Sequence, residues 1–110
     1  MAVYVKELIP SKYSGIAQST QYTASNCQAI IDKFTATNTS ASNSTISVNL
    51  VPNGLGADQS NCITFNRIIA SGETYTFPEL CGHVIGSGGY ISTACDSAYT
   101  VIRCSGREIT

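Results

Sequence analysis

Alternation of apolar and polar side chains is the clearest pattern along the chain. Between Ser44 and Val51, the apolar residues Ile46, Val48 and Leu50 alternate with polar neighbours, which is typical of a β-strand with one buried face. The same two-residue period, over shorter or less regular stretches, predicts further strands. These are Ala2–Leu8, Ala29–Thr37, Ile63–Ile69, Glu73–Phe77, Tyr90–Cys95, Tyr99–Cys104 and a short tail strand at Arg107–Thr110. We therefore expect about eight short strands.

Turn-forming residues separate the predicted strands. Asn38–Asn43 and Ala70–Glu73 are rich in small polar residues, and Gly86–Gly89 supplies residues that tolerate positive φ. Consecutive strands joined by such turns are expected to pair as antiparallel hairpins in two packed sheets. The sequence thus predicts an all-β fold, a single-domain antiparallel β-sandwich, jelly-roll-like, that spans residues 1–110.

Two segments do not follow the strand pattern. Residues 52–61, from Pro52 to Asn61, are too many for a tight hairpin loop and too polar for the core, so we expect them to project from one end of the sandwich. Pro10–Ser19 lacks a regular period, and residues 1–19 are therefore expected to form an N-terminal arm and its connection to the sandwich. Pro78–Val84 is predicted to form a single helical turn between the sheets.

Composition favours strands and narrows the range of partners. Ser, Thr and Asn make up 33 of the 110 residues, and these types disfavour helices because their side chains compete for backbone hydrogen bonds. Six basic residues, scattered singly among seven acidic ones, form no basic stripe for nucleic acid. The apolar runs are far shorter than a membrane span, and no export signal opens the chain. We expect a soluble, unexported protein that binds neither nucleic acid nor a membrane.

The chain has five cysteines, an odd number, so at least one thiol stays free or pairs with another chain. They are Cys27, Cys62, Cys81, Cys95 and Cys104. Without an export signal, we expect five reduced thiols that serve mainly as small apolar side chains in the core.

No motif points to catalysis or to a bound cofactor. His83 is the only histidine, and Cys81 lies two residues before it with no second cysteine or histidine pair to complete a zinc site. The nearby glycines lack the order of a phosphate-binding loop, and Glu73 and Glu79 form no evident acid–base pair. We therefore expect no enzyme activity, no cofactor and no metal site. The six tyrosines remain open to two interpretations, as a sugar- or protein-binding face or as strand residues.

Several stretches of the chain resemble small structural proteins of tailed-bacteriophage virions. These stretches are Met1–Pro10, Phe34–Ser40, Ile46–Leu50, Ile69–Phe77, Gly88–Thr93 and the ending Ser105–Thr110. In length and single-domain layout, the chain is most similar to the capsid decoration, or staple, proteins of epsilon-15-like short-tailed phages.

The resemblance implies a non-enzymatic protein on the capsid exterior, assembled in the host cytoplasm, that joins neighbouring major capsid subunits and stabilises the shell. It also implies a homodimer whose partner is the major capsid protein. The candidates for capsid contact are Val3, Tyr4, Val5, Tyr13, Asn53, Leu55 and Asp58. One alternative function is a phage neck or tail component. The other alternative is not a virion protein but a carbohydrate-binding module that uses the tyrosines, or a small hydrolase built around His83.

Overall fold

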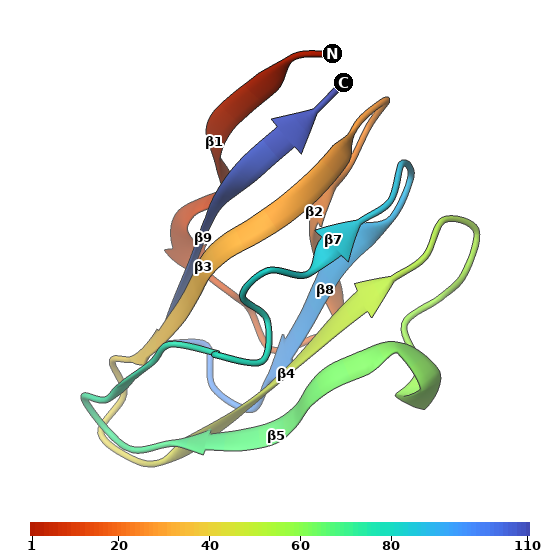
Figure 1. Cartoon of the computed structure of the whole chain (residues 1–110). Helices are drawn as coiled ribbons and strands as arrows, with labels where there is room; N and C mark the ends of the chain where they lie inside the picture. The colour runs from red at the N-terminus through yellow and green to blue at the C-terminus, as the bar shows by residue number, and fades with distance from the viewer.

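Two antiparallel sheets packed face to face account for most of the chain in the computed structural model, which describes residues 1–110 (Figure 1). Sheet A holds, in order, β1 (Val3–Tyr13), β9 (Thr100–Ile109), β3 (Gln28–Asn38) and β6 (Thr74–Tyr75), and β7 (Val84–Ile85) also pairs with β3. Sheet B holds β2 (Ser19–Thr23), β8 (Tyr90–Cys95), β4 (Ser44–Val51) and β5 (Cys62–Ile69). A short 3-10 turn, η1 (Gln59–Asn61), precedes β5. The all-β sandwich expected from the sequence is confirmed.

The strands are connected as in a jelly roll. Apart from the short β7, they pair in a nested way: β4 with β5, β3 with β6, β2 with β8 and β1 with β9. A long hairpin folded over onto itself produces this nesting, which is the arrangement of the eight-stranded jelly roll. Only β4 and β5 are consecutive strands that pair, so the expectation of successive hairpins is wrong. Turn residues mark where the chain reverses, but they do not specify which strand it meets next.

Strands β1 and β9 are both longer than the alternation predicted. β1 continues through Pro10 to Tyr13, although the sequence predicted an end at Leu8. Proline is tolerated there because β1 is an edge strand and Pro10 lies between two register shifts in its pairing with β9. β9 is one strand through Gly106, where the sequence predicted two.

Strands β2 and β7 do not follow from the sequence pattern, and the helical turn expected at Pro78–Val84 is absent. β2 and β7 have five and two residues, too few for a clear period. Residues 78–83 form successive reverse turns instead, in which the N–H of Leu80 donates to the carbonyl of Phe77 and that of His83 to the carbonyl of Leu80. Backbone bonds between Ile31 and this segment then dock it against β3.

Side chains from both sheets fill the space between them. Phe34 and Phe77 are fully buried, with ring centroids 4.8 Å apart at an interplanar angle of 69°, the edge-to-face arrangement that aromatic pairs prefer. Leu8 and Ile9 are both buried because a register shift follows Glu7, so Leu8 belongs to the core.

All five cysteines are unpaired in the structure. Cys27, Cys95 and Cys104 are buried, Cys62 is half-buried and Cys81 is exposed. Burial, together with the charges of Asp32 and Cys81, raises the pKa of the Cys104 thiol to about 12, so this side chain is a neutral apolar residue of the core.

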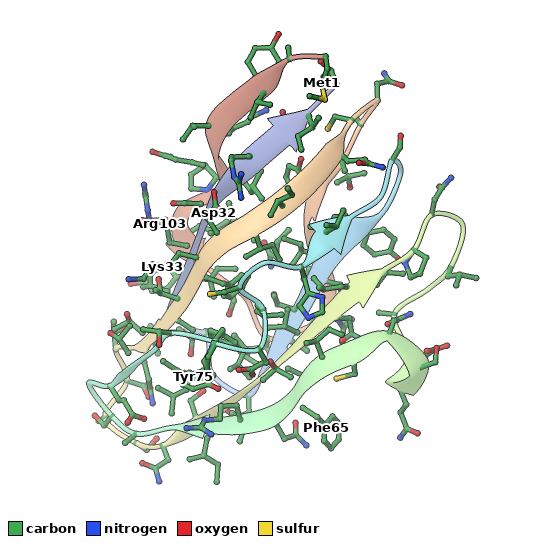
Figure 2. All side chains as sticks on the ribbon, viewed as in Figure 1. Met1, Asp32, Lys33, Phe65, Tyr75 and Arg103 are labelled. Atoms are coloured by element: carbon green, nitrogen blue, oxygen red, sulfur yellow. The ribbon has the colours of Figure 1, made fainter.

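Glu79 links the two sheets by hydrogen bonds to β5 of sheet B and to β6 of sheet A. Its Oε2 accepts a hydrogen bond from Thr64 Oγ1 of β5 at 2.5 Å, and its Oε1 accepts one from the Tyr75 hydroxyl of β6 at 2.7 Å. The Arg67 guanidinium lies 4.2 Å from the centroid of the Tyr75 ring, which Figure 2 labels. Burial raises the pKa of Glu79, but the hydrogen bonds from Thr64 and Tyr75 and the charge of Arg67 outweigh it, and the net pKa lies below its ordinary value.

Candidate interaction surfaces

The first half of β1 presents an apolar strand edge, which we call the β1 edge and define as Val3, Tyr4 and Val5. These side chains are 52%, 55% and 87% exposed. Because successive side chains of a strand point to opposite faces, both faces of sheet A are apolar and exposed at this edge. An exposed apolar strand edge is a typical site for pairing with another chain.

The backbone of the β1 edge has hydrogen-bonding groups without partners. Ala2 and Thr110 exchange two backbone hydrogen bonds, from Ala2 N to Thr110 O at 3.3 Å and from Thr110 N to Ala2 O at 3.0 Å. Hydrogen-bonded and outward residues alternate along an antiparallel strand. The N–H and C=O groups of Val3 and Val5 therefore point away from β9 and toward solvent.

Polar contacts hold the β1 edge in place beside β9. The Glu108 carboxylate accepts hydrogen bonds from the Tyr22 hydroxyl and from Lys6 Nζ, the latter at 3.0 Å. The hydrogen bond from Tyr22, followed by that from Lys6, lowers the pKa of Glu108, while burial and the bond to Glu108 raise the pKa of Tyr22. This network ties β1 and β9 to β2 of sheet B.

The solvent-facing side of sheet A, opposite the face that carries Glu108 and Lys6, carries two ion pairs. Arg107 binds both carboxylate oxygens of Asp32, with a shortest distance of 2.9 Å from Nη2 to Oδ1, and Arg103 lies 3.3 Å from Glu7. Figure 2 labels Asp32 and Arg103 along this face. The exposed apolar side chains on the solvent side of sheet A include Val3 and Val5 of β1 and Val84 of β7, which is 58% exposed.

Tyr13 lies at the far end of β1, away from the β1 edge. It is 58% exposed, and its ring packs edge-on against Tyr99 with 6.3 Å between the centroids. The two rings form a separate exposed aromatic pair beside the start of β9.

Loop 52–61 contains the other three predicted contact residues and is held in place by its own hydrogen bonds. Leu55 is 57% exposed, and its carbonyl accepts a hydrogen bond from the Tyr90 hydroxyl at 2.8 Å. Asp58 Oδ1 accepts from the backbone N–H and the hydroxyl of Ser60, and these bonds lower the pKa of Asp58. Asn53 lies directly beside Gly88, which adopts a φ of +82° in its turn.

The structure divides the seven predicted residues between opposite sides of the molecule. β1 is the edge of sheet A and contacts β2, the sheet B edge that lies farthest from β5 and loop 52–61 (Figure 1). Val3, Tyr4 and Val5 lie together at one end of β1, Tyr13 lies at its other end, and Asn53, Leu55 and Asp58 lie across the sandwich.

Sequence reasoning missed one exposed apolar group, on β5. Ile63, Phe65 and Ile68 are 37%, 70% and 60% exposed, and Figure 2 shows Phe65 pointing away from the ribbon. The alternation in Ile63–Ile69 would place Phe65 on the same face as the buried Ile69. A β-bulge near Asn66, which has a φ of 47°, shifts the register and places Phe65 outside. An asparagine inside a strand pattern was the only sequence signal for this bulge.

The only histidine lies in a turn. His83 is exposed and its imidazole makes no hydrogen bond, whereas its carbonyl accepts one from the N–H of Ile31 at 3.0 Å. No three His, Cys, Asp or Glu side chains gather closely enough to hold a metal ion. The structure also has no helix long and apolar enough to cross a membrane.

Compared with protein-family models, curated proteins and solved structures, the chain has no significant match.

Proposed function

We propose that this chain is a non-enzymatic structural protein of a phage virion, a decoration protein that joins neighbouring major capsid subunits on the outside of the shell. The observation that carries the proposal is the β1 edge, an apolar strand edge with unpartnered backbone groups. Such an edge binds other chains by strand addition, which supplies affinity through backbone hydrogen bonds and specificity through alternate side chains. The jelly-roll connectivity adds support, since viral capsid proteins commonly use it.

The proposal includes a homodimer formed by the β1 edges of two copies. In an antiparallel pair centred on Tyr4, Val3 of one copy faces Val5 of the other, and their outward N–H and C=O groups match as a hydrogen-bonded pair. Tyr4 then faces Tyr4, and Lys6 faces Ala2. Centring the pair on Lys6 would instead place two like charges opposite each other, which is destabilising. The register centred on Tyr4 therefore pairs the apolar residues of the edge with one another.

A second contact region is needed for a protein that holds two subunits together. Loop 52–61, on the other side of the sandwich, offers the exposed Leu55 and a backbone already fixed by the Asp58 cap. A rigid loop loses little conformational entropy when it binds. Each copy then contributes one loop contact, and the dimer formed through the β1 edges holds two such contacts together, which strengthens attachment through effective concentration.

Virions assembled with and without the chain test this function. Because a protein that binds only the assembled shell stabilises it by mass action, shells without it should have normal size and symmetry but release DNA at a lower temperature. Adding back purified protein should restore the release temperature, whereas a Leu55→Asp variant should restore it less.

Copy number distinguishes the shell from the neck or tail. A decoration protein is present in many copies spread over the shell, and a neck or tail component is confined to one ring. Shells that cannot form without the chain, or that are equally robust without it, would contradict the proposed decoration role.

A further inference from the structure

A groove crosses the outer face of sheet B, beneath loop 52–61. Its volume is about 220 Å³, and the residues that line it include Gln18, Ser47, Asn49, Asp58, Phe65 and Ala94. The small side chains Ser47 and Ala94, paired across β4 and β8, form its floor. The groove is smaller than the ~300 Å³ at which pockets for drug-sized ligands begin, so it suits a compact ligand.

Two amide side chains of the groove are held in fixed orientations by hydrogen bonds. Asn49 is only 4% exposed, and its Nδ2 donates to the Asp58 carbonyl and to Asn61 Oδ1, both at 2.8 Å. Gln18 Nε2 donates to Ser92 Oγ at 2.7 Å. Asn49 thus uses both of its amide hydrogens inside the protein, whereas the exposed Gln18 uses one.

The acceptor oxygens of these side chains have no partner within the chain. Asn49 Oδ1 and Gln18 Oε1 accept no hydrogen bond, and Asp58 uses only Oδ1 for the bonds from Ser60. The one buried side-chain oxygen or nitrogen without a partner is Gln21 Oε1, so Asn49 Oδ1, in a residue that lines the groove, reaches solvent. The groove thus offers preorganised acceptors to a ligand that brings O–H donors.

Phe65 gives the groove an apolar wall. Its ring is 70% exposed and lies on the bulged strand β5. An aromatic ring gains free energy when an apolar surface covers it. No Lys or Arg lines the groove, and the Asp58 carboxylate repels anions. A suitable ligand is uncharged, carries several hydroxyls and has one apolar face.

We propose that the sheet B groove binds a neutral saccharide. The C–H face of one pyranose ring packs against Phe65, and its hydroxyls donate to Asn49 Oδ1, Gln18 Oε1 and the Asp58 carboxylate. This site differs from a tyrosine-based sugar face, because no tyrosine lines the groove. The inference goes beyond the decoration role and does not depend on it.

Chemical-shift titration of the ¹⁵N-labelled full chain tests the site. The probes are neutral trisaccharides of glucose, mannose and galactose, each added to tens of millimolar. Binding by at least one probe should move the amide signals of Asn49, Cys62 and Phe65 and leave those of the β1 edge unchanged. Phe65→Ala should weaken that binding at least about tenfold.

A matched control separates stacking from a general loss of apolar surface. Ile68 is on the same strand, is 60% exposed and does not line the groove, so Ile68→Ala should bind as the unaltered chain does. Gln18→Ala provides a second variant outside the core and should also weaken binding. The proposal is overturned if no probe moves the groove signals, or if Phe65→Ala and Ile68→Ala bind equally well.

Discussion

At the scale of single residues, asparagine side chains organise the connections between strands. Asn38 is fully buried, and its Nδ2 donates to the carbonyls of Ser42 and Ile69 while its Oδ1 accepts from the N–H and hydroxyl of Ser40. One side chain thus satisfies backbone groups on the turn after β3 and at the end of β5. The high asparagine and serine content favours turns for this reason.

Asp96 gives the fold a specific dependence on pH. Its Oδ1 accepts hydrogen bonds from the Thr45 N–H and the Ser44 hydroxyl, each at 2.8 Å, and these bonds lower the pKa of Asp96. A carboxyl whose pKa is lower in the folded state stabilises the fold above its unfolded pKa, and that contribution is lost as the pH falls through the folded pKa. We expect the melting temperature to fall on acidification from neutral pH to about pH 3.

The Asp96→Asn variant shows how much of the fall in melting temperature on acidification is due to Asp96. The amide keeps an acceptor oxygen for Ser44 and Thr45 but does not titrate. The melting temperature of the variant should therefore fall by a few degrees less than that of the unaltered chain over the same pH change. Thermal unfolding followed by circular dichroism measures both, and equal losses would show that the Asp96 hydrogen bonds do not contribute to acid sensitivity.

At the scale of elements, β9 depends on a glycine in its middle. A Cβ at Gly106 would lie 2.1 Å from the Ile30 carbonyl oxygen and 2.7 Å from Leu8 Cδ1. The oxygen belongs to the backbone of β3, so it could move only by separating β3 from β9. Gly106→Ala should lower the free energy of unfolding by about 2 kcal/mol or more, as measured by urea denaturation.

Gly56→Ala is the matched control for this substitution. Gly56 lies in loop 52–61, and an added Cβ there would meet no atom within 4 Å. Its free energy of unfolding should stay within about 0.5 kcal/mol of the original. A Gly106→Ala variant as stable as the control would mean that β3 and β9 can separate at little cost.

The locations of the strands were largely predictable from alternation. Which strands pair with each other, and which side chains of β5 are exposed, were not. Ser44–Val51 is a strand with the bounds that the pattern gave, and Ser44, Ile46 and Val48 of one face are buried. The predicted strands Tyr99–Cys104 and Arg107–Thr110 form the single strand β9. Alternation within Ile63–Ile69 does not predict the exposure of Phe65, because a single bulge residue reverses the alternation. Both differences arise from contacts between strands that are distant in sequence.

Local sequence pattern also predicts only those candidate surfaces that a single segment forms. Val3, Tyr4 and Val5 were identifiable because an apolar strand followed by Pro10 and a stretch without a regular period is typical of a sheet edge. The groove on sheet B was not identifiable, since it joins Gln18, Asn49 and Phe65 from three separate segments. Its acceptors depend on hydrogen bonds that only the folded chain forms.

At the scale of the whole molecule, the sandwich is elongated and has four edge strands, β1 and β6 of sheet A and β2 and β5 of sheet B. Its extents are 45 × 26 × 20 Å, and the chain termini lie beside each other at the end that carries the β1 edge (Figure 1). Among the other edges, β5 carries a bulge and β2 a register shift, and β6 and β7 have only two residues each. Bulges and short edge strands hinder pairing with a further strand. Self-association by strand pairing is therefore directed to β1.

Substitution of Val5 tests the dimer proposed for this edge. Val5→Pro removes the outward N–H and leaves the bonds between β1 and β9 intact, because those involve Ala2, Tyr4 and Lys6. Val5→Thr keeps that N–H and a β-branched side chain and serves as the control. A standard interface buries about 800 Å² per partner, and the β1 edge offers only three exposed apolar residues for pairing. We therefore expect the unaltered chain to form a weak dimer, which sedimentation velocity detects at high protein concentration. The Val5→Thr variant should dimerise similarly, and Val5→Pro should remain monomeric. A dimer that survives Val5→Pro would place the interface elsewhere, and a monomer at every concentration of the unaltered chain would contradict self-pairing of β1.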